Sequence, residues 1–306
     1  IVINQQSLKV HAPSDSSQFS HFVSLASTSK NENQRRDALS FLSSQISSLP
    51  TNHEPPLSIS ILLTKLLPLI LDGSTSVRAQ LLRFLHVIPK NNINCCVENA
   101  LLYTRAGMTH LSVEIRIDAL EVLEWLLEVA QEDIVSCPGG WVKILKCFMN
   151  IMGWVSPNDS SKWSFETTVS FGKFRKAYPK QLVVFAKFIR AGLIESEFSK
   201  ALSAKKISER LNRNAVLFPI VDLHLNMIPR ISNPYSHLNL FGAPRDEESE
   251  LYTDRKARQK VFYERFLSDI YIGVEKARKE GGEIGRAAAI LEETLKQGMS
   301  DYKISK

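Results

Sequence analysis

Histidines and cysteines are the side chains best suited to chemistry, and their spacing does not assemble a site. The histidines are scattered, with no H-E-x-x-H pattern and no close pair, and His86 is interpreted as packed or half-exposed rather than as a ligand. Adjacent Cys95 and Cys96 could hold a soft metal ion, but we interpret them as buried small apolar side chains. No C-x-x-C pair occurs, so zinc and redox motifs are weak, and a reducing compartment is the default expectation. We predict neither a metal nor a cofactor.

Three glutamates, Glu121, Glu124 and Glu128, recur at i, i+3 and i+7. This spacing puts them on one face of a helix rather than opposite each other as an acid–base pair. With Glu132 and Asp133 they form an acidic stripe, which indicates either a solvated face or a docking surface for a basic partner. Glycine-rich phosphate loops and the G-x-S-x-G motif do not occur in the sequence. We therefore predict that the chain is not an enzyme.

Basic side chains are concentrated in the second half of the chain. Residues 1–171 hold 13 Lys and Arg against 15 Asp and Glu, whereas residues 172–306 hold 25 against 17. This balance indicates a polyanionic partner, nucleic acid first. The alternatives are that these Lys and Arg residues only solvate the outer face of a solenoid, or that they bind acidic protein partners. The aromatic rings among them could stack on bases or on partner side chains. The candidate RNA or partner contacts are Lys173, Phe174, Arg175, Lys176, Tyr178, Lys180, Lys205, Lys206, Arg210 and Arg213.

A nine-residue phrase occurs three times, as QRRDALSFL at 34–42, VRAQLLRFL at 77–85 and IRIDALEVL at 115–123. Aligned on Arg35, Arg78 and Arg116, the copies are 43 and 38 residues apart, which is the period of HEAT and armadillo repeats. The apolar residues of each copy fall on one helical face, which a single hairpin cannot bury alone. Each arginine lies in the first turn, where it could reach a carboxylate or a loop carbonyl of the adjacent repeat. The alternative is that ordinary amphipathic helices share this pattern.

The rest of the chain also favours helices, because apolar residues recur at three and four rather than at two. Hydrophobic residues make up 44% of the chain and only 13 residues are Gly, which fits an all-α, armadillo/HEAT-like solenoid. The longest apolar run contains Lys65 and Pro68, is too short to span a membrane, and predicts a helix kinked by Pro68. We expect helices at 16–28, 31–48, 57–72, 75–88, 93–106, 112–130 and 138–153, then a long one at 252–279 and a short one from 285.

This pattern predicts a division of the chain into five parts. The parts are an extended segment at 1–15, helical repeats at 16–155, a basic continuation of the repeats at 156–228, an irregular connection at 229–250, and C-terminal helices with a tail at 251–306. Because the sequence begins at Ile1 rather than at a methionine, we also expect a further segment before it.

The block at 112–154 resembles a known family. It is similar to the fungal pre-ribosomal-RNA-processing proteins involved in processing of internal transcribed spacer two, whose animal counterpart is the testis-expressed protein ten family. The similarity covers about residues 30–155, and its motifs are structural rather than catalytic. The residues that carry it are Gly107-Met108-Thr109-His110, Glu114-Ile115-Arg116, a buried acid at Asp118, Trp125 and the closing Gly153-Trp154.

The resemblance implies a scaffold of the Rix complex in the nucleolus and nucleoplasm. It implies partner subunits with proline-rich helical repeats and with a WD-repeat propeller, binding to pre-60S particles, support for removal of the second internal transcribed spacer, and recruitment of the AAA-type ATPase midasin. The family's Lys-rich leading tail does not occur in this sequence. An alternative is a transport or signalling adaptor, but Trp125, Trp141, Trp154 and Trp163 do not follow the repeat as import adaptors require.

Overall fold

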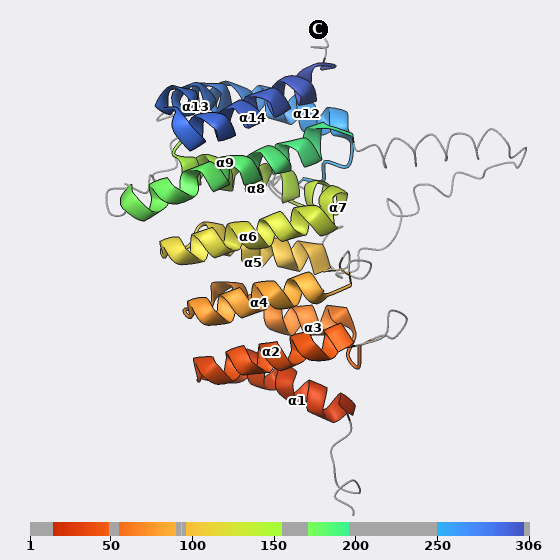
Figure 1. Ribbon diagram of the computed structural model, residues 1–306. Helices are drawn as coiled ribbons and strands as arrows, with labels where there is room; N and C mark the ends of the chain where they lie inside the picture. The colour runs from red at the N-terminus through yellow and green to blue at the C-terminus, as the bar shows by residue number, and fades with distance from the viewer. Residues whose placement is uncertain are drawn as a thin grey trace, which may run out of the picture.

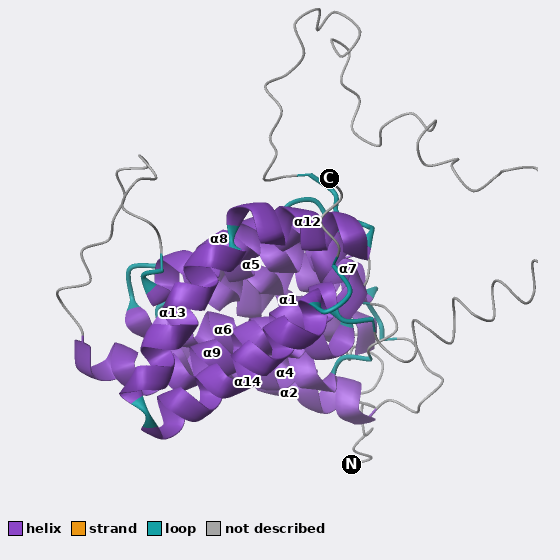
Figure 2. Cartoon of the chain, turned by 90° about the horizontal axis from the view of Figure 1, so that it is seen from above, coloured by secondary structure: helices purple, strands orange, loops and turns teal. Residues whose placement is uncertain are grey.

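A computed structural model describes residues 15–48, 55–89, 93, 96–154, 171–195 and 250–302, with the backbone alone at residues 15 and 171–176. Every regular element within these ranges is a helix (Figure 2), which confirms the predicted all-α class. The elements are α1 (Asp15–Thr28), α2 (Glu32–Ser48), α3 (Ile59–Leu66), the 3₁₀ helix η2 (Leu67–Leu71), α4 (Thr75–Val87), α5 (Val97–Met108), α6 (Val113–Val129), α7 (Gln131–Ser136), α8 (Gly140–Met152), α9 (Phe171–Leu193), α12 (Arg255–Arg265), α13 (Leu267–Glu280) and α14 (Gly282–Met299).

The helices stack in two layers along one axis (Figure 1). One layer consists of α2, α4, α6, α9 and α14, and each packs against the next. Behind it, α1, α3 with η2, α5 and α8 follow one another in the same order. Each pair of front and back helices leaves an apolar face that only its neighbours cover, as expected of an armadillo/HEAT-like solenoid.

Most predicted helix positions are close to the observed ones, and the departures have local causes. The helix predicted at 57–72 stops at Leu66 and continues as a 3₁₀ turn, because Pro68 has no N–H to donate to the carbonyl four residues earlier. The predicted start of α5 at 93 is wrong, since the helix begins at Val97. The short helix α7 was not predicted; it forms where Ala130 leaves the helical conformation (φ −137°, ψ 46°) and the chain turns.

The long helix predicted at 252–279 is wrong in one respect, since it consists of α12 and α13 separated at Phe266 (φ −123°, ψ −30°). Phe262, Phe266, Ile270 and Val274 are nevertheless all buried. Because this apolar stripe keeps its period across the break, the sequence pattern indicated one helix. The final helix begins at Gly282, slightly before the predicted position.

One hydrophobic core runs from Phe19 in α1 to Leu295 in α14. The C-terminal helices therefore do not pack apart from the repeats: α14 lies along α9, and Trp141 of α8 stacks on Phe188 of α9. The indole N–H of Trp141 donates to the backbone oxygen of Arg258 in α12 at 3.2 Å. The described part of 156–306 thus completes the same solenoid.

Two glycines frame α8. Gly139 (φ 68°) precedes the helix and Gly153 (φ 67°) ends it, in left-handed conformations that side chains with a Cβ rarely adopt. The turn at Gly153 brings Trp154 against Gly273 of α13, where a Cβ atom would lie 2.2 Å from the indole ring. The Gly-Trp pair that closes the family motif therefore sets the contact between α8 and the C-terminal helices.

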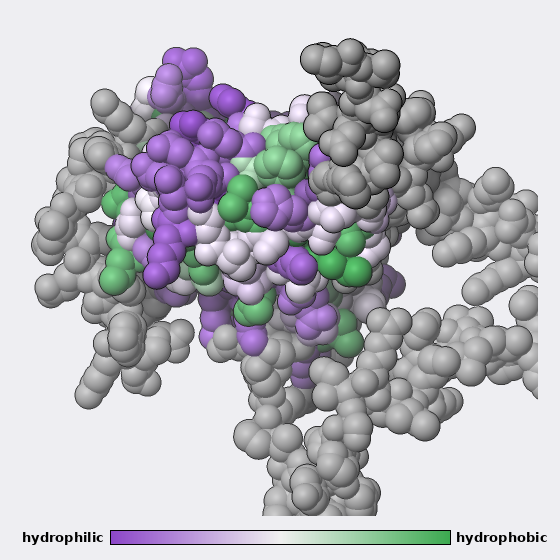
Figure 3. Space-filling view, turned by 90° about the horizontal axis from the view of Figure 1, so that it is seen from below, coloured by the Kyte–Doolittle hydropathy of each residue, from purple (hydrophilic) through white to green (hydrophobic). Residues whose placement is uncertain are grey.

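The N-terminal end of the solenoid is covered mainly by polar side chains. Exposed serines, Gln18 and His21 lie on the outer surface of α1, while Phe22 stacks on Phe41 of α2 at a ring-centroid distance of 3.9 Å. Viewed from this end, hydrophobic side chains reach the surface in a few separate groups among hydrophilic ones (Figure 3). A polar first helix is what a terminal repeat needs, because no further described repeat covers it.

The contact of Trp154 with Gly273 gives a stability prediction. In Gly273→Ala, the new methyl group must displace the indole ring, so we expect the free energy of unfolding to fall by about 1–3 kcal/mol. Chemical denaturation monitored by circular dichroism measures this change. The matched control is Gly285→Ala in α14, where the nearest atom would lie 3.4 Å away and the helix gains propensity. Equal stability of the two variants would contradict the close packing.

Candidate partner-binding groove

Four arginines at helix starts make the same contact. The Nη1 atoms of Arg35, Arg78, Arg116 and Arg258 donate to the backbone oxygen of the residue six positions earlier, at 2.6–2.9 Å. The backbone N–H of each arginine bonds to the carbonyl four residues earlier, at the helix start. The arginine therefore ties the first turn of the helix to the loop that enters it. For Arg35, Arg78 and Arg116, which the sequence pattern singled out, this carbonyl belongs to the loop that enters the same helix rather than to the adjacent repeat.

At Arg35 and Arg78, a carboxylate extends this contact to another repeat. Arg35 pairs with Asp72 at 2.9 Å, and Arg78 pairs with Asp118 at 2.7 Å. Asp72 accepts Arg35 through its side chain and Arg78 through its backbone oxygen, so it links the first pair to the second. The expected burial of Asp118 is only partly right, since its side chain is 35% exposed while that of Arg78 is 2% exposed. We call this series the arginine ladder.

Arg258 is the member of the ladder that the sequence analysis missed. Its guanidinium donates to the backbone oxygen of Gly192 at the end of α9 and to the carboxylate of Glu132 in α7, at 2.9 and 3.0 Å. Arg258 thus joins three parts of the chain that are far apart in sequence. The sequence does hold a signal for this contact. Asp254 is the N-cap residue four positions before Arg258, as Ser74 and Ser112 are the N-cap residues four positions before Arg78 and Arg116.

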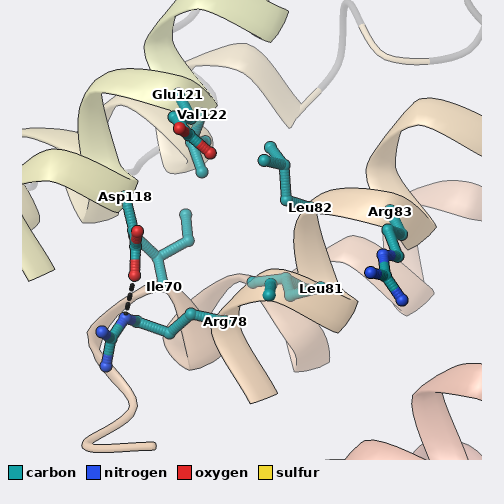
Figure 4. A pocket seen from close by; sticks show the side chains of 9 residues that line it. Ile70, Arg78, Leu81, Leu82, Arg83, Asp118, Glu121 and Val122 are labelled. Carbon is teal, nitrogen blue, oxygen red and sulfur yellow. Dashed lines mark hydrogen bonds and ion pairs between the residues drawn. The ribbon is translucent and has the colours of Figure 1, made fainter. Parts of the chain in front are cut away.

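A groove lies between α4 and α6 and reaches α9. It consists of two adjoining cavities of about 190 and 260 Å³, which share Leu82 and Glu121. The ladder pair of Arg78 and Asp118 closes one end, as Figure 4 shows. The apolar residues that line the groove are Ile70, Ala79, Leu81, Leu82, Val122 and Trp125.

The acidic stripe predicted on α6 forms one wall of this groove. Lys180 and Lys187 of α9 pair with Glu121 and Glu124, both at 2.5 Å. These two glutamates therefore already bind a basic helix of the same chain. Glu128 is exposed, and no ion pair joins it to another residue that the structure describes. Glu132 at the end of the stripe binds Arg258.

The predicted RNA contacts are placed only in part. Lys180 pairs with Glu121. Tyr178 is half-buried; burial raises the pKa of its phenol, and a hydrogen bond with Trp154 lowers that pKa by a smaller amount. Both placements favour structural roles for these two residues. The side chains of Lys173, Phe174, Arg175 and Lys176, and all of Lys205, Lys206, Arg210 and Arg213, lie outside the described residues, as does the connection at 229–249.

Reactive groups do not converge in the part of the chain that the structure describes. No set of three or more His, Cys, Asp or Glu side chains there could hold a metal ion. Cys96 is buried as predicted, and Cys95 lies outside the described residues. Burial is the main cause that raises the pKa of the Cys137 thiol, to about 11, so it is a weak nucleophile at neutral pH. Among the helices described, none is both long and apolar enough to cross a membrane.

Sequence comparisons identify relatives that match almost the whole chain. A protein from Sclerotinia sclerotiorum named pre-rRNA-processing protein ipi1 is 54% identical over 99% of this chain and 86% of its own length. A protein of the same name from Pyricularia oryzae is 44% identical over 99% and 87%. The chain belongs to the Ipi1 family. A family profile described as a Rix1 complex component involved in 60S ribosome maturation matches residues 91–189. This membership confirms the resemblance found in the sequence.

The segment that matches the Ipi1 profile contains α5 to α8 and most of α9. It therefore includes the acidic wall of the groove and both lysines that pair with it. A chain from a solved Rix1–Rea1 pre-60S particle is also similar, with a TM-score of 0.45 and 22% identity over 69% of this chain and 78% of that chain.

The arginine ladder of this Ipi1 family member gives a second stability prediction. Arg78→Met keeps the apolar stem but removes the bonds to the Asp72 carbonyl and to Asp118. We expect the free energy of unfolding to fall by about 2–3 kcal/mol, because Arg78 is buried although Asp118 is partly exposed. Denaturant unfolding of the full chain measures this loss.

Arg36→Met is the matched control. Arg36 is the neighbour of a ladder residue and, among the residues that the structure describes, pairs only with the adjacent, exposed Asp37, so the expected loss is below about 1 kcal/mol. If both variants lost the same stability, the ladder would not hold the repeats together.

Proposed function

We propose that the chain is a non-catalytic scaffold subunit that supports maturation of the large ribosomal subunit. The observation that carries this proposal is the 54% identity, over 99% of the chain, with a protein named for pre-rRNA processing. The described residues support the scaffold part, since they form one continuous stack of helices with long exposed faces. Such stacks bind partners along their surface without needing a reactive site.

The finer function follows the resemblance. The chain acts in the nucleolus and nucleoplasm as a subunit of the Rix complex, beside a proline-rich helical-repeat subunit and a WD-repeat propeller subunit. The complex binds pre-60S particles, supports processing of the second internal transcribed spacer, and helps recruit the AAA-type ATPase midasin. The profile match to a Rix1 complex component supports the assembly.

Purification of the protein with its natural assembly tests this function. The full-length protein is tagged in its own cells, isolated gently, and separated on a density gradient with identification of protein and RNA. We expect it to sediment with large-subunit precursors that contain spacer RNA, together with a propeller subunit and a second helical-repeat subunit. We also expect spacer-containing precursors to accumulate after depletion of the protein. Light fractions containing only transport receptors or signalling proteins would refute the ribosomal function.

Direct RNA contact is a separate part of the proposal. In Lys205→Glu/Lys206→Glu, loss of two phosphate contacts should weaken binding to spacer RNA and make the negative slope of log K against log salt shallower by about 1.4–1.8. Filter binding across a salt series measures both quantities. The matched control is Lys30→Glu/Lys65→Glu, two exposed lysines near the N-terminal end of the solenoid. An unchanged slope in the first variant would remove this pair from the RNA contacts.

A further inference from the structure

Helix α9 carries basic side chains on one face. Lys180, Lys187 and Arg190 are seven and three residues apart, which corresponds to about two turns and one turn of a helix. Lys187 and Arg190 are exposed, and Lys180 is half-buried. A row of cations on an accessible helix face attracts the phosphates of RNA. By its sequence alone, this face of α9 would therefore be a binding surface for RNA.

The acidic stripe of α6 occupies part of this basic face. Helix α9 packs against α6, which lies beside it in the front layer (Figure 1). The ammonium group of Lys180 pairs with Glu121 at 2.5 Å. The ammonium group of Lys187 pairs with Glu124, also at 2.5 Å. With Glu128, three carboxylates of α6 stand beside three cations of α9, so the two faces together are close to neutral.

These two ion pairs matter more for charge than for stability. The side chains of Lys180 and Lys187 are 39% and 44% exposed, and ion pairs that exposed contribute little to stability. Buried Phe185 and Phe188 already hold α9 in the core. The carboxylates belong to the same molecule, however, so their effective concentration at the lysines far exceeds that of a phosphate in solution. The α6 glutamates are therefore effective competitors of RNA.

We propose that the acidic stripe of α6 is an autoinhibitory contact that keeps Lys180 and Lys187 from binding RNA. A phosphate group must displace Glu121 and Glu124 before it reaches these ammonium groups, and Glu128 repels it as it approaches. RNA is therefore bound by other basic residues of the chain. The role of this contact in the cell rests on the proposed function, of which RNA contact is a part.

Removal of the two carboxylate charges tests the proposal. Glu121→Gln/Glu124→Gln keeps the shape of both side chains and frees both lysines. We expect the affinity of the full chain for a short oligouridylate to rise at least about tenfold at low salt, and the negative slope of log K against log salt to become steeper by about 1.4, because two more phosphates are bound. Filter binding across a salt series measures both quantities. An unchanged affinity would refute the autoinhibitory contact.

Two further variants separate released lysines from a mere change in net charge. Glu283→Gln/Glu293→Gln alters the net charge equally, but at two exposed glutamates of α14 that form no ion pair with another described residue. We expect it to leave RNA binding nearly unchanged. Adding Lys180→Met/Lys187→Met to the α6 variant should abolish its gain. An equal gain in the α14 variant, or a gain that survives the loss of the lysines, would overturn the proposal. Thermal unfolding checks that all variants fold alike.

The outcome is distinguishable from that of the proposed function. If the natural chain sediments with large-subunit precursors and binds spacer RNA, but the α6 variant gains no affinity for oligouridylate, the autoinhibitory contact is refuted and the proposed function stands. If the α6 variant gains affinity through its lysines while the natural chain neither binds spacer RNA nor sediments with the precursors, the proposed function fails and the contact stands as a barrier to nucleic acid.

Discussion

A buried arginine in the first turn of a helix is the contact on which the order of the stack depends. Apolar faces drive helices together, but burial is non-directional and does not by itself set which turn meets which loop. Arg35 and Arg78 supply that direction, because each joins its entering loop to a carboxylate of the next repeat. Asp72 receives both arginines and so couples two successive junctions. Arg258 repeats the device where the C-terminal helices meet α7 and α9.

The sequence predicted the parts of this structure that repeat. The nine-residue phrase that contains Arg78 recurs because each hairpin needs leucines to fill the core and an arginine to hold the loop that enters the helix. The contact of Arg258 was not predictable in the same way, since its partners Glu132 and Gly192 lie 126 and 66 residues away. Likewise, the break at Phe266 leaves the apolar period unchanged. Neither a contact between residues far apart in sequence nor a helix break that keeps the apolar residues on one face changes the local periodicity of the sequence.

The acidic stripe shows how tertiary packing resolves an ambiguity that the sequence leaves open. Spacing at i, i+3 and i+7 establishes one helical face, but it cannot distinguish solvent from a partner. In the structure, α9 crosses that face and brings Lys180 and Lys187 to Glu121 and Glu124. Part of the basic charge of the second half therefore neutralises part of the acidic charge of the first. A patch inferred from composition alone overstates the charge available to a polyanion.

The groove and the ladder share residues, and this has a mechanical consequence. Arg78 and Asp118 line one cavity and also hold the junction between α4 and α6. The junction is thus fixed at one end by a directional ion pair, while an opening remains beside Leu82 and Trp125. The ion pair therefore holds the two helices that line this opening at a fixed spacing. The contact that orders the repeats therefore also shapes the opening between them.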